Sequence, residues 1–185
     1  ANAGVRQVHF LGGEPTIRKD FLEICKAAKE AGLEFSYNTN GIRQDENYLT
    51  NIADLDPSGI TISVDGPDAL SHDQVRGEGT FEKTVSYVRK LVALREERNS
   101  KRPSIQIQSV LTASWADRAE AMVELAVDLK ADSLVVNHLA SMGDAIANSD
   151  DLTVDQITTF RASQRVLKTL ERYPQLNVSV PIRLK

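Results

Sequence analysis

Hydrophobic positions follow two different periods along this chain, and each change of period marks the boundary of a predicted element. Short apolar or alternating stretches are typical of strands, whereas apolar residues every three or four positions are typical of helices. Strands are predicted over residues 5–11, 33–38, 60–64, 104–111 and 133–138, with a last strand over 176–180 that Pro181 marks as frayed or at an edge.

Capping residues set the expected helix limits. Asp20 with Glu23, and Thr153 with Gln156, have the spacing of capping boxes, and Ser114 is a candidate N-cap. The helices so predicted run from 21 to Gly32, from about 46 to 53, from Thr80 through 92, from 115 to about 129, and from 154 to about 172.

Strand and helix alternate five times, which predicts an α/β fold with a parallel sheet and right-handed crossovers. Such a chain can form either an open, doubly wound sheet or part of a barrel. No GxGxxG follows the first strand, so a dinucleotide-binding fold has no support. Polar, glycine-containing segments instead follow four strands, at 12–15, 38–41, 63–66 and 137–144. Because parallel strands bring such ends to one rim, a curved sheet around a small ligand is favoured.

Composition excludes several classes of function. The chain has 185 residues, a net charge of −4, an ordinary apolar fraction and no long basic block, which argues against disorder and against nucleic-acid binding. No apolar run approaches the about 20 residues of a membrane span. The single cysteine, Cys25, excludes an internal disulfide, reads as a small core residue of a helix, and fits a reducing, cytoplasmic compartment.

The segment GGEP carries the first chemical signal. Gly12 and Gly13 let backbone atoms approach a ligand without a Cβ in the way. Glu14 adds a negative charge, which suits a ligand cation better than a phosphate. Directly after a strand, this combination predicts a binding loop, although GGEP alone could also form only a tight turn.

Two further signals lie in SVDG and in the segment after it. Ser63 and Asp65 stand two residues apart, on the same side of an extended strand, and a hydroxyl beside a carboxylate suits sugar hydroxyls. Arg76 could reach back as a clamp for a carboxylate. A cation, a carboxylate and a ribose together describe an amino-acid nucleoside.

GGEP, TNG and SVDGPDALSHDQVRGEGTFEK, in this order and spacing, resemble the radical S-adenosylmethionine (radical SAM) family. The resemblance is close over residues 5–92 and continues as topology to about 172. It implies a partial (β/α)6, TIM-like barrel. It also implies a [4Fe-4S] cluster that cleaves S-adenosylmethionine reductively, giving a 5′-deoxyadenosyl radical that abstracts hydrogen from a substrate.

The same resemblance implies a role for each matching residue. Gly12, Gly13 and Glu14 would hold the methionine ammonium of S-adenosylmethionine, and Arg76 would approach its carboxylate. Ser63 would contact the ribose, with Asp65 beside it. Asn40 would line the same cavity, and the strand at 133–138 with the residues just after it would offer backbone to the adenine.

One departure from the family is large. The family holds its cluster with three cysteines in CxxxCxxC after its first barrel strand, and this chain has neither the motif nor the cysteines. We therefore expect residues 1–185 to be a single domain, truncated at both ends, that lacks the first βα unit. The cluster would belong only to the full-length protein, and this fragment by itself would be inactive.

The expected function is the core of a radical SAM oxidoreductase, with peptide modification or cofactor biosynthesis as reaction classes and an unnamed substrate. The alternative is a cluster-free, barrel-like module that binds a nucleoside or small metabolite or acts as a scaffold. A metal-dependent aldolase or hydrolase barrel lacks a His/Asp ligand set at strand ends. Finally, with no strand before it, the apolar segment 5–11 would leave one edge unpaired, so self-association through this edge is also predicted.

Overall fold

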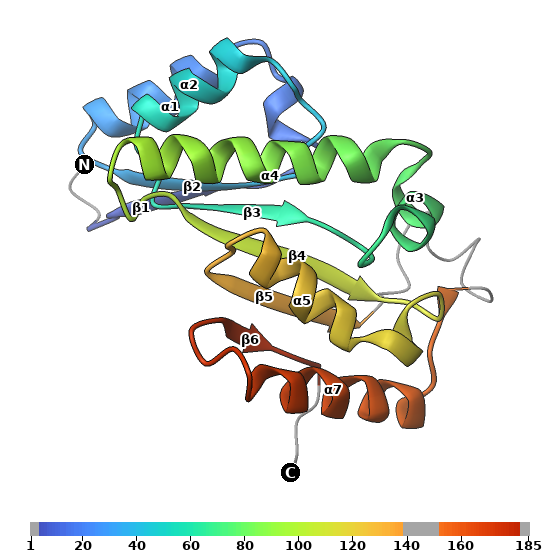
Figure 1. The fold of residues 1–185 in the computed structure, drawn as a ribbon. Helices are drawn as coiled ribbons and strands as arrows, with labels where there is room; N and C mark the ends of the chain where they lie inside the picture. Colours follow the sequence, from blue (N-terminus) through green and yellow to red (C-terminus); the bar gives the residue numbers. More distant parts are fainter. Residues whose placement is uncertain (1–3, 139–151, 182–185) are drawn as a thin grey trace. The chain divides into compact units, whose positions relative to one another are not determined.

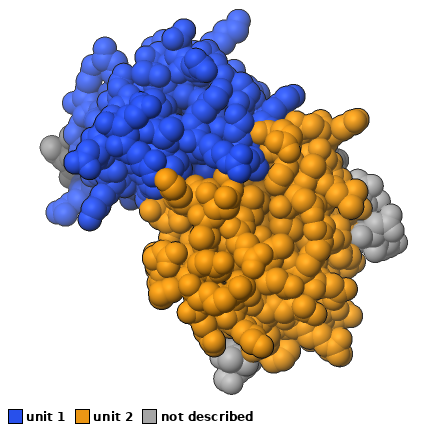
Figure 2. Space-filling view, viewed as in Figure 1, with its two compact units in different colours: residues 1–63, 83–106 blue, residues 64–82, 107–185 orange. Residues whose placement is uncertain are grey.

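A computed structural model describes residues 4–138 and 152–181 (Figure 1). The chain forms two compact units, drawn in separate colours in Figure 2. Unit 1 contains residues 1–63 and 83–106, and unit 2 contains residues 64–82 and 107–185. Each unit is described by itself.

Unit 1 is built on three parallel strands. Its elements are β1 (Gln7–Phe10), the 3-10 turn η1 (Pro15–Ile17), α1 (Phe21–Glu30), β2 (Glu34–Thr39), α2 (Glu46–Asp54), β3 (Gly59–Ser63), most of α4 (Thr80–Glu97) and the start of β4 (Ser104–Leu111). In the register, Gln7 lies beside Glu34, and Ser36 lies beside Gly59. The strand order therefore follows the chain, as short parallel crossovers require.

The two faces of the unit 1 sheet differ in chemistry. Figure 1 shows α1, α2 and α4 on one side of β1–β3. Alternate strand residues are buried, among them Phe35, Tyr37, Ile60 and Ile62. The positions between them carry polar side chains, of which Asn38 and Thr61 are partly exposed and Ser36 is buried. This alternation puts the apolar core between sheet and helices and leaves the opposite face polar.

Unit 2 contains the rest of β4 and the later elements. These are α3 (Ala69–Arg76), η2 (Ala116–Arg118), α5 (Glu120–Asp128), β5 (Ser133–His138), α7 (Gln156–Leu170) and β6 (Asn177–Ser179). β5 and β6 are parallel, with Ser133 beside Asn177. The core includes Trp115, Met122, Leu134 and Val166, each nearly inaccessible to solvent. None of the described helices combines the length and the apolar character needed to cross a bilayer.

The predicted α/β fold with a parallel sheet is confirmed. The six strands have the order β1-β2-β3-β4-β5-β6, and β4 contributes residues to both units. Within the described residues the sheet is not closed, and β1 and β6 are its edges. Val5 and Leu11 flank β1 and are more than half exposed. Self-association through residues 5–11 stays a prediction.

Two predicted caps are wrong, and the third, Asp20, holds the N-cap position of α1 without the predicted side-chain bond. Asp20 makes no capping hydrogen bond to α1, because its carboxylate pairs with Arg18 at 2.7 Å. Ser114 bonds the Thr112 hydroxyl at 2.9 Å, and α5 begins only at Glu120. Helix α7 is capped by Asp155, not by Thr153. Thr153 lies two residues too early because Asp155 accepts the Thr158 N–H.

Candidate functional site

The loop after β1 keeps an open backbone at its two glycines. Gly12 has a φ of +143°, a conformation that residues with a side chain rarely adopt. A Cβ built at Gly12 or Gly13 would meet no atom within 4 Å. Packing within the chain therefore does not explain Gly13, and the space that its missing side chain leaves is open to a ligand.

The Glu14 carboxylate is held entirely by hydrogen bonds from its own unit. Its Oε1 accepts from the Thr16 N–H at 3.0 Å, the Thr16 hydroxyl at 2.6 Å and the Thr39 hydroxyl at 2.9 Å. Its Oε2 accepts only from the Asn40 N–H, at 2.6 Å. No cationic side chain of the described residues pairs with it. The loop is thus tied to the end of β2 by a carboxylate whose charge is not neutralised.

Asn40 and Gly41 form a tightly held turn after β2. The Asn40 carbonyl accepts from the Thr84 hydroxyl at 2.8 Å, and its Oδ1 accepts from the Ile42 N–H at 3.1 Å. Gly41 has a φ of +69°, and a Cβ there would lie 3.1 Å from Ile62. The turn therefore requires glycine and presents the Asn40 backbone N–H to Glu14, while the Asn40 amide nitrogen has no partner in the described chain.

Ser63 is the last residue of β3 and is half-buried. Its hydroxyl makes no hydrogen bond to any described residue, so both its proton and its lone pairs remain available to a ligand. Because β3 ends at Ser63, the strand alternation that predicted a common side for Ser63 and Asp65 does not extend to Asp65.

Asp65 is buried and its carboxylate is fully used within unit 2. Oδ1 accepts from the Val110 N–H at 2.9 Å, and Oδ2 accepts from Arg76 Nε at 2.5 Å. Only 2% of the Asp65 side chain is exposed, against 35% for Arg76. A buried carboxylate without its cation would be costly, so this ion pair explains why Asp65 remains inside.

Arg76 ends α3 with part of its guanidinium uncommitted. Nε is bound by Asp65, whereas the two terminal nitrogens have no partner among the described residues. Gly77 follows with a φ of +100° and its N–H bonds Asp73. The arrangement fixes the direction of the Arg76 side chain and leaves two N–H-bearing groups that suit a carboxylate.

Sequence reasoning missed α3 and its buried His72. The Asp65 N–H donates to His72 Nδ1 at 3.1 Å, so that nitrogen carries no proton, and the ring packs edge-on against Phe81. Burial lowers the pKa of His72 below its usual value. The neighbouring Asp73 orders the following turn by accepting from the Gly79 and Phe81 N–H groups. In the sequence, the dipeptide His72-Asp73 was the feature that could have pointed to this ordered segment.

Among the described residues, no three His, Cys, Asp or Glu side chains are grouped as a metal site. Cys25 is fully buried in α1, as predicted, and burial raises the pKa of its thiol to about 12. It therefore stays a protonated core residue. Of the segment predicted to meet the adenine, the strand at 133–138 is described, and the residues just after it, from 139 on, lie outside the described residues.

Comparison with known families decides the identity. The model of the radical SAM superfamily matches residues 1–100, more than half of the chain. The chain belongs to the radical SAM superfamily. It is 32% identical over 148 residues to the PqqA peptide cyclase of Rhodopseudomonas palustris, covering 80% of this chain and 38% of that protein. It is 31% identical over 145 residues to the mycofactocin maturase MftC of Mycolicibacterium smegmatis, covering 78% and 35%.

Several solved structures share the fold. Streptococcus suis SuiB bound to S-adenosylmethionine matches with a TM-score of 0.75 and 16% identity, over 94% of this chain and 39% of SuiB. The enzyme anSMEcpe with bound AdoMet matches with a TM-score of 0.72 and 16% identity, over 95% of this chain and 48% of that protein. The radical SAM chain described here thus spans less than half the length of these relatives.

Proposed function

We propose that this chain is the S-adenosylmethionine-binding core of a radical SAM enzyme that modifies a peptide, with cofactor biosynthesis as one setting for that reaction. The similarity to a PqqA peptide cyclase and to a mycofactocin maturase supports this reaction class. SuiB, a structural neighbour, is known bound to its precursor peptide SuiA. A peptide is therefore the substrate class that we assign to the whole protein.

The observation that carries the proposal is the uncompensated charge of Glu14. Its four hydrogen bonds come from neutral groups, and the second lone pair of Oε2 is left for a ligand. An ammonium is the partner that such a site lacks. The backbone at Gly12 and Gly13, unobstructed by any side chain, supports the same assignment.

Unit 2 supplies an independent argument. The terminal nitrogens of Arg76 suit the ligand's carboxylate, and Asp65 acts as the residue that positions Arg76. In unit 1 the free hydroxyl of Ser63 suits a ribose hydroxyl, and Asn40 shapes the adjoining turn. These are the groups that an amino-acid nucleoside requires.

The cluster places a further condition on the proposal. A [4Fe-4S] cluster supplies the electron for reductive cleavage of S-adenosylmethionine, and it needs a set of cysteine thiolates. This chain has one cysteine, which is buried. In the proposal, therefore, these 185 residues bind and orient S-adenosylmethionine, and cluster ligands come from residues outside them.

Calorimetric titration with S-adenosylmethionine tests the assignment. The wild-type chain should bind S-adenosylmethionine weakly, because without the cluster only contacts with the protein hold the ligand. Glu14→Gln should weaken binding about tenfold or more and Ser63→Ala about fivefold, as expected for loss of a charged and a neutral hydrogen bond. Glu23→Gln, an exposed carboxylate change on α1, is the matched control and should leave binding unchanged. No binding by wild type, or equal binding by all four proteins, would contradict the site.

A further inference from the structure

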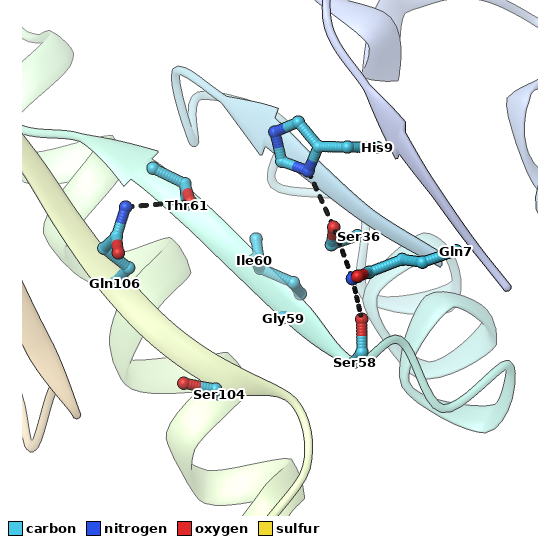
Figure 3. A pocket seen from close by; sticks show the side chains of 9 residues that line it. All are labelled: Gln7, His9, Ser36, Ser58, Gly59, Ile60, Thr61, Ser104 and Gln106. Atoms are coloured by element: carbon cyan, nitrogen blue, oxygen red, sulfur yellow. Dashed lines mark hydrogen bonds between the residues drawn. The ribbon is translucent and has the colours of Figure 1, made fainter. Parts of the chain in front are cut away.

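The polar face of the unit 1 sheet contains a pocket that the proposed S-adenosylmethionine contacts do not use. Its volume is about 260 Å³. Figure 3 shows its lining, which consists of Gln7, His9, Ser36, Ser58, Gly59, Ile60, Thr61, Ser104 and Gln106. The inward positions of barrel strands are usually filled by bulky, branched apolar residues. Here six of the nine lining residues carry a hydroxyl or an amide, so this face is suited to hydrogen bonding more than to packing.

A chain of hydrogen bonds fixes the β1 side of the pocket. The Gln7 amide nitrogen donates to the Ser58 hydroxyl at 3.1 Å and to the Ser36 hydroxyl at 3.4 Å (Figure 3). The Ser36 hydroxyl lies 2.7 Å from His9 Nδ1, and His9 Nε2 lies 3.0 Å from Asn38 Oδ1. Since the Asn38 oxygen can only accept, Nε2 carries the proton and Nδ1 accepts from Ser36.

These donor and acceptor roles determine which hydrogen-bonding groups of the pocket remain free for a ligand. With its nitrogen committed to two serines, Gln7 presents a carbonyl oxygen that accepts no hydrogen bond from the described residues. The Thr61 hydroxyl accepts from the Gln106 amide at 3.3 Å and retains its own proton. The Ser104 hydroxyl has no partner in the described chain. The pocket therefore combines one free acceptor with hydroxyls that can donate.

The charge of the lining narrows the ligand class. Among the described residues, no Asp, Glu, Lys or Arg lines the pocket, and His9 is the one ionisable side chain that does. A charged ligand would lose hydration without meeting an opposite charge, which is unfavourable. A neutral group that donates one hydrogen bond and accepts another matches the free carbonyl and hydroxyls, and an amide has this pattern.

We propose that this pocket binds an uncharged amide, either a primary carboxamide or a peptide group. Gln7 accepts from the amide N–H, and the Thr61 or Ser104 hydroxyl donates to the amide oxygen. His9 and Ser36 are positioning residues that hold Gln7 in the receptive orientation. None of the lining residues belongs to the S-adenosylmethionine constellation, so the inference stands apart from the proposed function. A volume slightly below the usual lower limit of about 300 Å³ for ligand pockets fits a small amide or one side chain.

Two-dimensional amide NMR of the chain tests this with three probes of similar size: acetamide, N-methylacetamide and acetate. Acetamide represents the carboxamide, N-methylacetamide the peptide group, and acetate a charged control of the same shape. We expect saturable shifts of the Gln7, Ser36, Ser58 and Thr61 amides with at least one amide probe. The probe that saturates at the lower concentration identifies which source of amide the pocket prefers.

Variants decide whether the pocket itself binds. Gln7→Leu and Thr61→Val should each raise the half-saturating concentration at least about fivefold. Gln156→Leu, the same change at an exposed position of α7, should not alter it. A variant whose amide signals stay dispersed is folded. If Gln7→Leu does not fold, Thr61→Val alone tests the pocket. The proposal is overturned if the shifts stay linear in probe concentration, or if acetate causes equal shifts. It is also overturned if both pocket variants keep the half-saturating concentration of the wild type.

Discussion

Glu14 and Asp65 are two carboxylates that each follow a strand, and the protein uses their charges in different ways. Glu14 accepts four hydrogen bonds from neutral groups and meets no cation in the described chain. Asp65 is buried against the Arg76 guanidinium and one backbone N–H. The charge of Asp65 is therefore neutralised inside unit 2, whereas the charge of Glu14 remains available.

This difference separates binding from positioning. A carboxylate already paired with an arginine has little to gain from a second partner, and its removal damages the fold first. A carboxylate that is hydrogen-bonded but unpaired can bind a ligand cation without giving up any contact. In the proposed function, ligand binding therefore falls to Glu14 and to the outer nitrogens of Arg76, and Asp65 has a supporting role.

The largest expected effect comes from breaking the Asp65–Arg76 pair. Asp65→Ala leaves the guanidinium without its anion and the Val110 N–H without its acceptor. We expect a loss of about 3 kcal/mol in the free energy of unfolding, the lower end for a broken buried pair because Arg76 is partly exposed. Urea unfolding monitored by circular dichroism measures it. Asp20→Ala, which breaks an exposed pair with Arg18, should leave the midpoint unchanged. Equal midpoints for the two variants would refute the supporting role of Asp65.

A smaller effect is expected from Glu14→Ala. The change removes the acceptor of the Thr16 and Asn40 N–H groups, so the two loops should separate locally while the core stays folded. We expect about 1–2 kcal/mol of lost local stability, seen as roughly five- to thirtyfold faster hydrogen exchange at the Asn40 amide. Exchange at Ile60, in the core, should not change. Faster exchange throughout unit 1 would mean that Glu14 also supports the core.

The smallest effect is a pH dependence from His72. Burial lowers its pKa, and Asp65 and Asp73 oppose that shift while Arg76 reinforces it. The unfolded chain therefore binds a proton more readily than the native protein. Stability should be complete above the unfolded pKa of about 6.5 and fall as the pH drops from there toward the lower native pKa. His72→Asn keeps an acceptor for the Asp65 N–H and cannot titrate. Urea midpoints at pH 7.5 and 5.5 should differ more in wild type than in this variant; an equal difference would remove His72 as the cause.

Much of the fold could be predicted from the sequence, because the hydrophobic period is strong where sheet meets helix. The predicted limits of β4 and β5 match the structure. Helix α3 was missed because its stability comes from its ends, the Asp68 N-cap and Gly77, and not from an apolar face; Leu70 within it is 82% exposed. Short polar helices of this kind leave no periodic signal.

Sequence reasoning could name candidate residues for the proposed site, but not the contacts that each of them makes. The spacing of Ser63 and Asp65 suggested a common side, but β3 ends at Ser63 and the Asp65 carboxylate is buried. The pocket proposed to bind an amide could not be predicted from the sequence, because Gln7, His9 and Ser36 have the pattern of a solvent-facing side of alternating strands. Which groups retain free hydrogen-bonding capacity follows only from the completed network.

The central claim is that the Glu14 charge serves a ligand ammonium. A double-mutant cycle tests it, with S-adenosylmethionine and an analogue lacking the α-ammonium titrated calorimetrically into wild type and Glu14→Gln. We predict that Glu14→Gln weakens S-adenosylmethionine about tenfold or more and leaves the analogue nearly unaffected, a coupling of about 1.5–3 kcal/mol. Equal losses for both ligands, or no loss for either, would contradict the assignment of Glu14.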